Sequence, residues 1–282
     1  MSGAANLELF LDQNMEKGEV RAVSGGVAGV YSHRSPQKET PNEDSAMIAE
    51  AAPDGVVLAV ADGVGGLNAG EHASSLALQE LGGAVCAAEA EGDALRAAVV
   101  TGFERANEAV VNLGIGAATT LAAVLIQGRV VRTFHVGDSM ILMVSQRGRV
   151  KLQTISHSPV GYALEAGVLD EKEAIHHDER HIVSNMVGTA EMRIEIGPAI
   201  EMAPRDTLFV ASDGVFDNLL VDEVVERVRK GQLARVLSVL AEDCLRRMST
   251  PEEGQPSKAD DLTFIAFRVK PRCRGSRRDR ER

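Results

Sequence analysis

Short apolar segments rich in β-branched residues recur along the chain and predict a set of strands. They lie at Gly26–Tyr31, Val56–Ala61, Thr119–Ile126, Val130–Val136, Ile141–Val144, Leu208–Ala211 and Leu262–Val269. Some are separated by only a few residues with turn character, such as Gln127-Gly128 and Arg147-Gly148. Neighbouring strands are therefore expected to pair antiparallel as hairpins, which favours mixed α and β structure over a simple doubly wound sheet.

Two longer segments have helical composition. Residues Glu71–Glu89 and Asp93–Asn112 are rich in Ala, Leu and Glu, and Asp93 is placed to cap the second segment. We expect them to form an antiparallel pair of helices. Near the C-terminus, Val221–Arg229 is a shorter helix candidate, and the apolar residues after it recur at helical spacing on one face. These residues are Leu233, Val236, Leu237, Leu240 and Cys244.

The chain is expected to form a single domain over residues 1–270. It has no internal repeat, and its 44% hydrophobic and 25% charged residues are typical of a globular protein. The segment 157–195 is polar, poorly periodic and long for a connection, which suggests a flap over a site. Its histidines, His157 among them, are expected to be satisfied or exposed rather than metal ligands.

The formal charge of −11 disfavours binding to nucleic acid or to anionic lipid. Residues 271–282 reverse this trend, with six Arg against one Asp and one Glu, and are expected to form a disordered basic tail. No segment reaches the roughly 18 consecutive apolar residues of a membrane span. The three cysteines form no CxxC pair and indicate neither a disulfide framework nor a zinc site. The sequence therefore predicts a cytoplasmic protein.

Acidic residues recur at the edges of the apolar strands. Asp62 ends VLAVAD, Asp138 follows FHVG, Asp213 follows LFVAS, and Asp260 opens DDLTFIAF. A carboxylate left unpaired beside a core is costly, so this repeated placement calls for a shared counter-charge. One Asp-Gly alone is most often only a turn. Four such positions together, with no His or Cys near most of them, favour Mg²⁺ or Mn²⁺ held by oxygen ligands.

Short motifs follow one another in a characteristic order between about Gly25 and Val269. They are NED (Asn42–Asp44), ADGVGG (Ala61–Gly66), ATT (Ala118–Thr120), VGDS (Val136–Ser139), ASDGVFDNL (Ala211–Leu219) and DDLT (Asp260–Thr263). In this order they resemble the metal-dependent protein phosphatase family, type 2C. The resemblance implies an α+β fold, a four-layer α/β/β/α sandwich of two antiparallel sheets flanked by helices, with a metal cleft at one edge.

The resemblance also implies roles for individual residues. Asp62 would bridge two metals, and the backbone carbonyl of Gly63 would complete the second metal site. Asp213 and Asp260 would hold the first metal. Asp62 and Asp213 would thus be catalytic through metal-bound water.

Further positions match the family less directly. Asp44 would bind through metal waters or directly, with Glu43 behind it, and Asp138 matches the position of a third, weaker metal. Many members carry a phosphate-binding arginine near Lys38, which here could act in its place as a point charge. The arginine that often follows GDS is Met140 in this chain, and we expect activity to survive that change.

The implied activity is Mn²⁺- or Mg²⁺-dependent hydrolysis of phosphoserine and phosphothreonine monoesters on proteins by a metal-bridging hydroxide. Its substrates would be phosphorylated proteins, so the enzyme would oppose a Ser/Thr kinase. A phosphorylated regulator as sole substrate would use the same chemistry. The non-enzyme alternative is a catalytically weak pseudophosphatase or signalling scaffold of the same fold, and the retention of every proposed metal aspartate argues against it.

Overall fold

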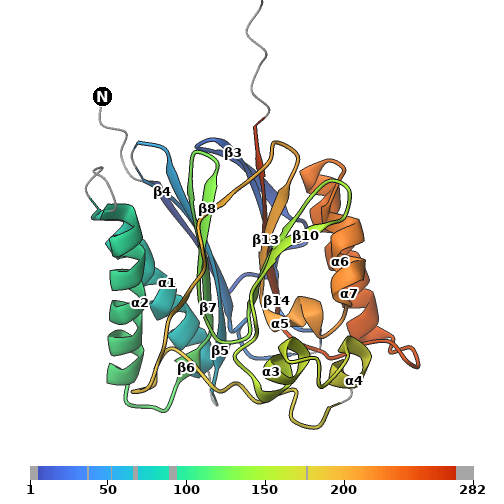
Figure 1. The fold of residues 1–282 in the computed structure, drawn as a ribbon. Coiled ribbons are helices and arrows are strands. Elements are labelled where there is room, and N and C mark those ends of the chain that lie inside the picture. Colours follow the sequence, from blue (N-terminus) through green and yellow to red (C-terminus); the bar gives the residue numbers. More distant parts are fainter. Residues whose placement is uncertain are drawn as a thin grey trace, which may run out of the picture.

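The computed structural model of the 282-residue chain describes residues 6–36, 38–51, 53–65, 69–88, 94–175 and 177–270. Its strands form two antiparallel sheets that lie face to face between helices (Figure 1). This is the four-layer α+β sandwich that the resemblance implies. In the described part of the chain, no helix is long and apolar enough to cross a membrane. The basic segment 271–282 lies outside the described residues.

The first sheet is built around a long central hairpin. Its strands are β1 (Asn6–Leu11), β4 (Asp44–Ala51), β5 (Gly55–Val64), β6 (Ala118–Thr119), β7 (Leu121–Gln127), β8 (Val130–Val136), β11 (Glu195–Ile196) and β12 (Ile200–Glu201). The strand order is β1-β4-β5-β7-β8-β11, with β6 beside β5 and β12 beside β8.

The second sheet has the strand order β10-β9-β13-β14-β3-β2. Its strands are β2 (Glu19–Val23), β3 (Gly26–His33), β9 (Met140–Val144), β10 (Val150–Gln153), β13 (Thr207–Ala211) and β14 (Leu262–Val269). The expected hairpins are confirmed, since β7 pairs with β8 and β9 with β10. Gly128 (φ +59°) and Gly148 (φ +84°) supply the left-handed turn conformations that these connections need.

Strand β5 shows how the layers are held together. Val56, Leu58 and Val60 pack into the core between the sheets, while Val57 and Ala59 pack against the helices on the outer face. Because successive side chains of a strand point to opposite faces, a strand buried on both faces is a continuous apolar run. This explains why the sequence pattern identified β5 readily.

Helices cover both outer faces of the sandwich (Figure 1). Helices α1 (Ala69–Cys86) and α2 (Ala94–Asn112) pack on the first sheet, and α6 (Val221–Val228) and α7 (Leu233–Ser249) on the second. All four helices were expected from the sequence, and the predicted apolar face of α7 is buried. The capping role of Asp93 lies outside the described residues.

Sequence patterns missed several strands and misjudged one. The strand predictions did not include β1, β2 and β4, in which charged residues interrupt the apolar ones. The single strand expected over Thr119–Ile126 is divided at Thr120, where the Asp62 N–H donates to the Thr120 hydroxyl oxygen at 3.0 Å rather than to a backbone carbonyl.

The segment 157–195 contains α3 (Pro159–Glu165) and α4 (Glu171–Ile175), which lie near the short helix α5 (Asp213–Phe216) at the lower edge of the sheets in Figure 1. Most of the rest of this segment is irregular. The division into one domain over 1–270 with a flap at 157–195 stays a prediction.

Candidate metal centre

Carboxylates from both sheets converge at one edge of the sandwich. Asp44 begins β4 and lies directly opposite Asp62 of β5 in the antiparallel ladder. From the second sheet, Asp213 follows β13 and begins α5, and Asp260 lies shortly before β14. The Ser212 hydroxyl donates to Asp44 Oδ2 at 2.7 Å and so ties the two sheets together at this point.

Two more carboxylates complete the cluster. Asp138 lies in the connection between β8 and β9, and its charge acts on Asp62. Asp217 ends α5, and its carboxylate lies within 4.8 Å of those of Asp213 and Asp260. Sequence reasoning assigned no role to Asp217. The available signal was its spacing, because residues four apart on a helix share one face.

The electrostatics of the cluster show a shortage of positive charge. Burial, reinforced by neighbouring carboxylates, raises the pKa of both Asp44 and Asp62 well above the usual range. Burial and the charge of Asp213 raise the pKa of Asp138 to about 7 and that of Asp260 to about 6. A divalent cation supplies the missing charge, and carboxylate oxygens are the donors that Mg²⁺ and Mn²⁺ prefer. The residues present therefore fit such a metal.

Lys258 is the cation that faces this cluster. Its ammonium lies 3.0 Å from Asp213 Oδ2, 2.7 Å from Asp217 Oδ2 and 2.8 Å from Asp260 Oδ2. Burial acts to lower the pKa of Lys258, but the three carboxylates outweigh it and raise that pKa. The local sequence SKAD gives little sign of this role, because two of the three partners, Asp213 and Asp217, lie in a different segment of the chain.

The backbone of Asp62 is held from three directions. Its N–H donates to Thr120 Oγ1 at 3.0 Å, and its carbonyl accepts from Thr120 N at 2.8 Å and from Thr119 Oγ1 at 2.8 Å. The ATT motif thus fixes the strand end. Next to it, a Cβ on Gly63 would lie 2.0 Å from the Gly70 carbonyl oxygen, so only glycine allows α1 to begin this close to β5.

Asp261 has a different environment from its neighbour Asp260. Its Oδ1 accepts from Ser35 N at 2.7 Å, and its Oδ2 accepts from Lys38 Nζ at 2.6 Å and from Glu43 N at 2.7 Å. Lys38 also donates to Glu43 Oε2 at 2.7 Å. The ammonium of Lys38 is thus engaged by two carboxylates, and its contact with phosphate stays a prediction.

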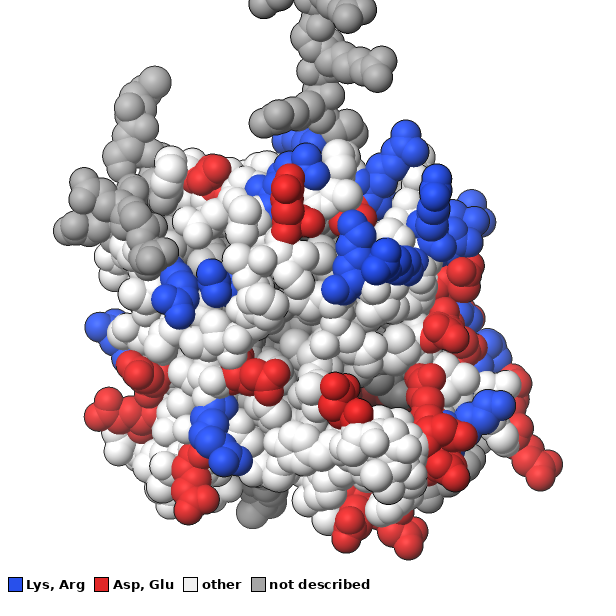
Figure 2. Space-filling view, in the orientation of Figure 1, with Lys and Arg blue, Asp and Glu red and all other residues white. Residues whose placement is uncertain are grey.

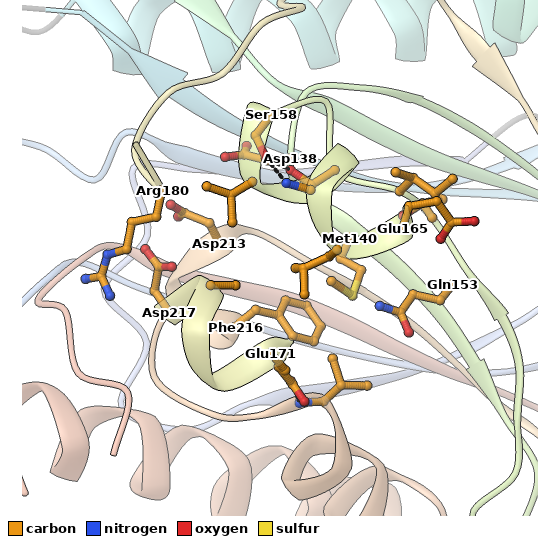
Figure 3. A pocket seen from close by; sticks show the side chains of 18 of the residues that line it. Asp138, Met140, Gln153, Ser158, Glu165, Glu171, Arg180, Asp213, Phe216 and Asp217 are labelled. Atoms are coloured by element: carbon orange, nitrogen blue, oxygen red, sulfur yellow. Dashed lines mark hydrogen bonds between the residues drawn. The ribbon is translucent and has the colours of Figure 1, made fainter. Parts of the chain in front are cut away.

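A cavity of about 560 Å³ extends from the cluster beneath α3 and α4. Figure 3 shows Asp138, Asp213 and Asp217 at one end and Met140 and Phe216 beside them. Further apolar side chains line it, namely Val150, Ile155, Val160, Leu164, Ile175 and Val221. Its volume is that of a small-molecule or side-chain site. In the space-filling view, acidic side chains dominate the lower part of this face, while Lys and Arg gather above (Figure 2).

A sandwich of two antiparallel sheets with buried carboxylates at their common edge and a cavity beside them defines a metal-binding protein of the α+β class. Comparison with known proteins is consistent with this. The family described as protein phosphatase 2C matches residues 31–249. The chain is 30% identical over 196 residues to the protein phosphatase PhpP of Streptococcus pneumoniae, covering 67% of this chain and 78% of PhpP.

Solved structures agree. A serine/threonine phosphatase of S. agalactiae has a TM-score of 0.73 and 27% identity, covering 86% of this chain and 99% of that one. The catalytic domain of the serine/threonine phosphatase PstP, solved with two manganese ions, has a TM-score of 0.67 and 26% identity, covering 86% and 98%. The chain belongs to the protein phosphatase 2C family and is a metal-dependent protein phosphatase.

Proposed function

We propose that the carboxylate cluster is the catalytic centre for hydrolysis of phosphoserine and phosphothreonine in phosphorylated proteins, using two Mn²⁺ or Mg²⁺ ions and a weaker third. The observation that carries this proposal is the burial of carboxylates from both sheets with raised pKa values, in a chain of this family. Bound divalent cations supply a water of lowered pKa and neutralise charge on the phosphoryl group.

Each residue of the centre has a distinct task. The ions would be held by Asp62, the Gly63 carbonyl, Asp213 and Asp260, with Asp44 binding through metal waters or directly, Asp138 for the weaker ion and Glu43 behind them. Asp217, which shares the cluster of Asp213 and Asp260, adds a further acceptor. Ser212 orients Asp44 by its hydrogen bond, and the threonines beside Asp62 hold its backbone. These supports keep the carboxylates in place, so that little ordering is needed when metal binds.

The cavity beneath α3 and α4 gives the substrate a place beside the reacting group. It is continuous with the carboxylates, and farther away it is lined by apolar side chains together with charged ones such as Glu165, Glu171 and Arg180. We propose that it receives the polypeptide around the phosphorylated residue, and that the enzyme opposes a Ser/Thr kinase. The cytoplasmic location stays a prediction.

The test is release of phosphate from a phosphothreonine peptide with Mn²⁺, by the full chain and by the variants Asp62→Asn and Asp213→Asn, each with and without excess chelator. The matched control is Asp206→Asn. Asp206 is also buried and paired with a lysine, Lys151, but it lies outside the cluster. We expect turnover only with metal, its loss in both cluster variants, and its retention in the control.

Two outcomes would contradict the proposal. If the chelator-treated enzyme turns over at the same rate, the reaction needs no metal. If the folded protein binds Mn²⁺ but hydrolyses no phosphopeptide, the pseudophosphatase or scaffold alternative replaces the enzyme. Thermal unfolding of each variant shows whether a loss of turnover reflects a loss of folding.

A further inference from the structure

A second cluster of titratable side chains lies beside the metal centre. His135 of β8, His157 at the start of the 157–195 segment and Glu195 of β11 each bring one ligand atom within 4.8 Å of the others. The two imidazole rings are 1% and 4% exposed and stack with centroids 4.4 Å apart. Two histidines and a glutamate can form a transition-metal site, but the hydrogen bonds here indicate a different role.

The hydrogen bonds determine the tautomer of His157. Its Nδ1 accepts from the backbone N–H of Gly137 at 3.0 Å and from the side-chain amide of Asn185 at 2.9 Å. A backbone N–H can only donate, so Nδ1 carries the lone pair and the proton lies on Nε2, 3.2 Å from Glu195 Oε2. A metal bound at Nε2 would need the opposite tautomer, with two N–H groups facing each other at Nδ1. His157 is therefore not a metal ligand in this arrangement.

The orientation of Asn185 is itself determined by its neighbours. Its Oδ1 accepts from Arg193 N at 3.0 Å, and its Nδ2 donates to the Arg193 carbonyl at 2.7 Å. The amide nitrogen must then face His157. On the other ring, His135 Nε2 lies 2.9 Å from the Ile155 carbonyl and donates to it, and its Nδ1 has no partner among the described residues. The stacked His135 ring thus supports His157 without competing for Gly137.

His157 holds both backbone polar groups of Gly137. Besides accepting its N–H, His157 donates its own backbone N–H to the Gly137 carbonyl at 3.0 Å. Gly137 has φ +105°, and a Cβ there would lie 2.6 Å from Thr120 Cβ, so this turn admits only glycine. The next residue is Asp138. The loop that presents Asp138 is therefore held at Gly137 by contacts with His157, and at Ser139 by a hydrogen bond of 2.7 Å between the Ser139 and Thr120 hydroxyls.

The 157–195 segment supplies the other half of this arrangement. The His157 carbonyl accepts from Ser184 N and Ser184 Oγ, both at 2.8 Å. Asn185 and Glu195 come from the same part of the chain. One residue thus joins the segment over the cavity to the loop that carries Asp138.

We propose that His157 is a positioning residue that holds the Asp138 loop for binding of a divalent cation, with Asn185 and Glu195 setting its tautomer. The inference rests on the proposed function, because it requires Asp138 to bind a cation. In this proposal the two ring nitrogens have different roles. Nδ1 accepts from Gly137 and holds the loop, while Nε2 only anchors the ring to the half-exposed Glu195.

The test is a pair of substitutions that separate the two nitrogens. In His157→Asn, the side-chain oxygen can take the place of Nδ1 as acceptor, whereas in His157→Gln the polar group extends toward the position of Nε2. Mn²⁺ binding to the full chain is measured by electron paramagnetic resonance of free Mn²⁺ and by calorimetry. We expect His157→Asn to keep the affinity of the weakest site within about threefold and His157→Gln to lower it roughly tenfold. The tighter sites should change little in either variant.

Asn185→Asp provides a second test, because the inference predicts weaker Mn²⁺ binding where the added negative charge alone would predict tighter binding. An added carboxylate near the loop should by itself attract a cation. Facing Nδ1, however, it favours the tautomer with a proton on Nδ1, which opposes the Gly137 N–H. We expect weaker Mn²⁺ binding at the weakest site and a changed amide resonance of Gly137.

The outcomes distinguish this inference from the proposed function. If His157→Gln binds Mn²⁺ as the unsubstituted protein does, or if Asn185→Asp binds it more tightly, the inference is overturned. It is also overturned if Asp62-dependent turnover is present but removing Asp138 has no effect on Mn²⁺ binding. If the unsubstituted protein neither binds Mn²⁺ nor hydrolyses phosphopeptides, the proposed function itself is wrong.

Discussion

We expect Lys258 to compete with a metal ion for the carboxylates of the cluster. Its ammonium contacts Asp213, Asp217 and Asp260 at 2.7 to 3.0 Å. A divalent cation that binds Asp213 and Asp260 must first displace it from those two. Replacing Lys258 with methionine keeps much of the side-chain length and removes the charge, so the variant should bind Mn²⁺ more tightly while its metal-free form becomes less stable.

The expected size follows from the exposure of the pair. Charged hydrogen bonds contribute about 1.5–3 kcal/mol when buried and under about 1 kcal/mol at the surface. With 31% of the Lys258 side chain exposed, we take about 1 kcal/mol for each of the two contacts that metal must break. The resulting gain of about 2 kcal/mol corresponds to roughly 30-fold tighter binding. The metal-free variant, with carboxylates left unpaired, should lose about 2–3 kcal/mol of unfolding free energy.

The expected gain in Mn²⁺ affinity and the expected loss of metal-free stability can both be measured on the Lys258→Met variant. Calorimetry gives the Mn²⁺ affinity, and thermal unfolding in chelator and in Mn²⁺ gives the two stabilities. The matched control is Lys151→Met, because Lys151 is 29% exposed and its ammonium lies 2.6 Å from the buried Asp206, away from the cluster. The control should lose stability without tighter Mn²⁺ binding. If Lys258→Met binds Mn²⁺ no more tightly than the unsubstituted protein, Lys258 does not compete with metal.

Three further predictions concern other parts of the molecule. Asp260→Asn should weaken Mn²⁺ binding, whereas Asp261→Asn should chiefly lower the unfolding free energy, by about 2–3 kcal/mol, because Asp261 holds neighbouring backbone groups; the reverse result would refute the assignment. Burial lowers the pKa of His135, so this side chain binds fewer protons in the folded protein than in the unfolded chain, and its own contribution to stability is lost as the pH falls below about 6.5, opposite in sign to that of the cluster carboxylates with raised pKa values. In urea titrations the unfolding free energy of the unsubstituted protein should therefore fall relative to that of His135→Gln below this pH, and an unchanged difference would contradict the reasoning. Because Met140 and other apolar side chains line the proposed substrate cavity, the enzyme should prefer an apolar residue beside phosphothreonine, and Met140→Arg should reduce that preference, measured as a ratio of kcat/KM, by roughly tenfold; an unchanged ratio would mean that the cavity does not contact the peptide.

Local sequence pattern was sufficient where burial dictates which positions are apolar. The doubly buried β5 was identified as a continuous apolar run, and the amphipathic α7 because its apolar positions repeat at helical spacing. Strands β1, β2 and β4 were missed because charged residues interrupt their apolar positions, so that no continuous apolar run marks them. Only pairing with neighbouring strands makes them part of a sheet.

Some residues of the candidate site could likewise be identified from local sequence, and others could not. Asp62, Asp138, Asp213 and Asp260 could be singled out because each follows or precedes an apolar strand, and strand ends collect at one edge of a sheet. Their assignment to particular metals came from the resemblance and stays a prediction. Asp217 carried a weak signal in its helical spacing from Asp213, and Lys258 carried little.

The sequence by itself determined the longer helices, most of the buried strands and the accumulation of carboxylates beside those strands, because these properties depend on residues close together in the chain. Only the tertiary structure decided that Asp260 faces the metal cluster while Asp261 holds a loop, and that His157 turns its Nδ1 to Gly137. These choices depend on hydrogen bonds between distant segments. A hydrogen bond needs both partners at a fixed distance and direction, and the folded chain alone provides that.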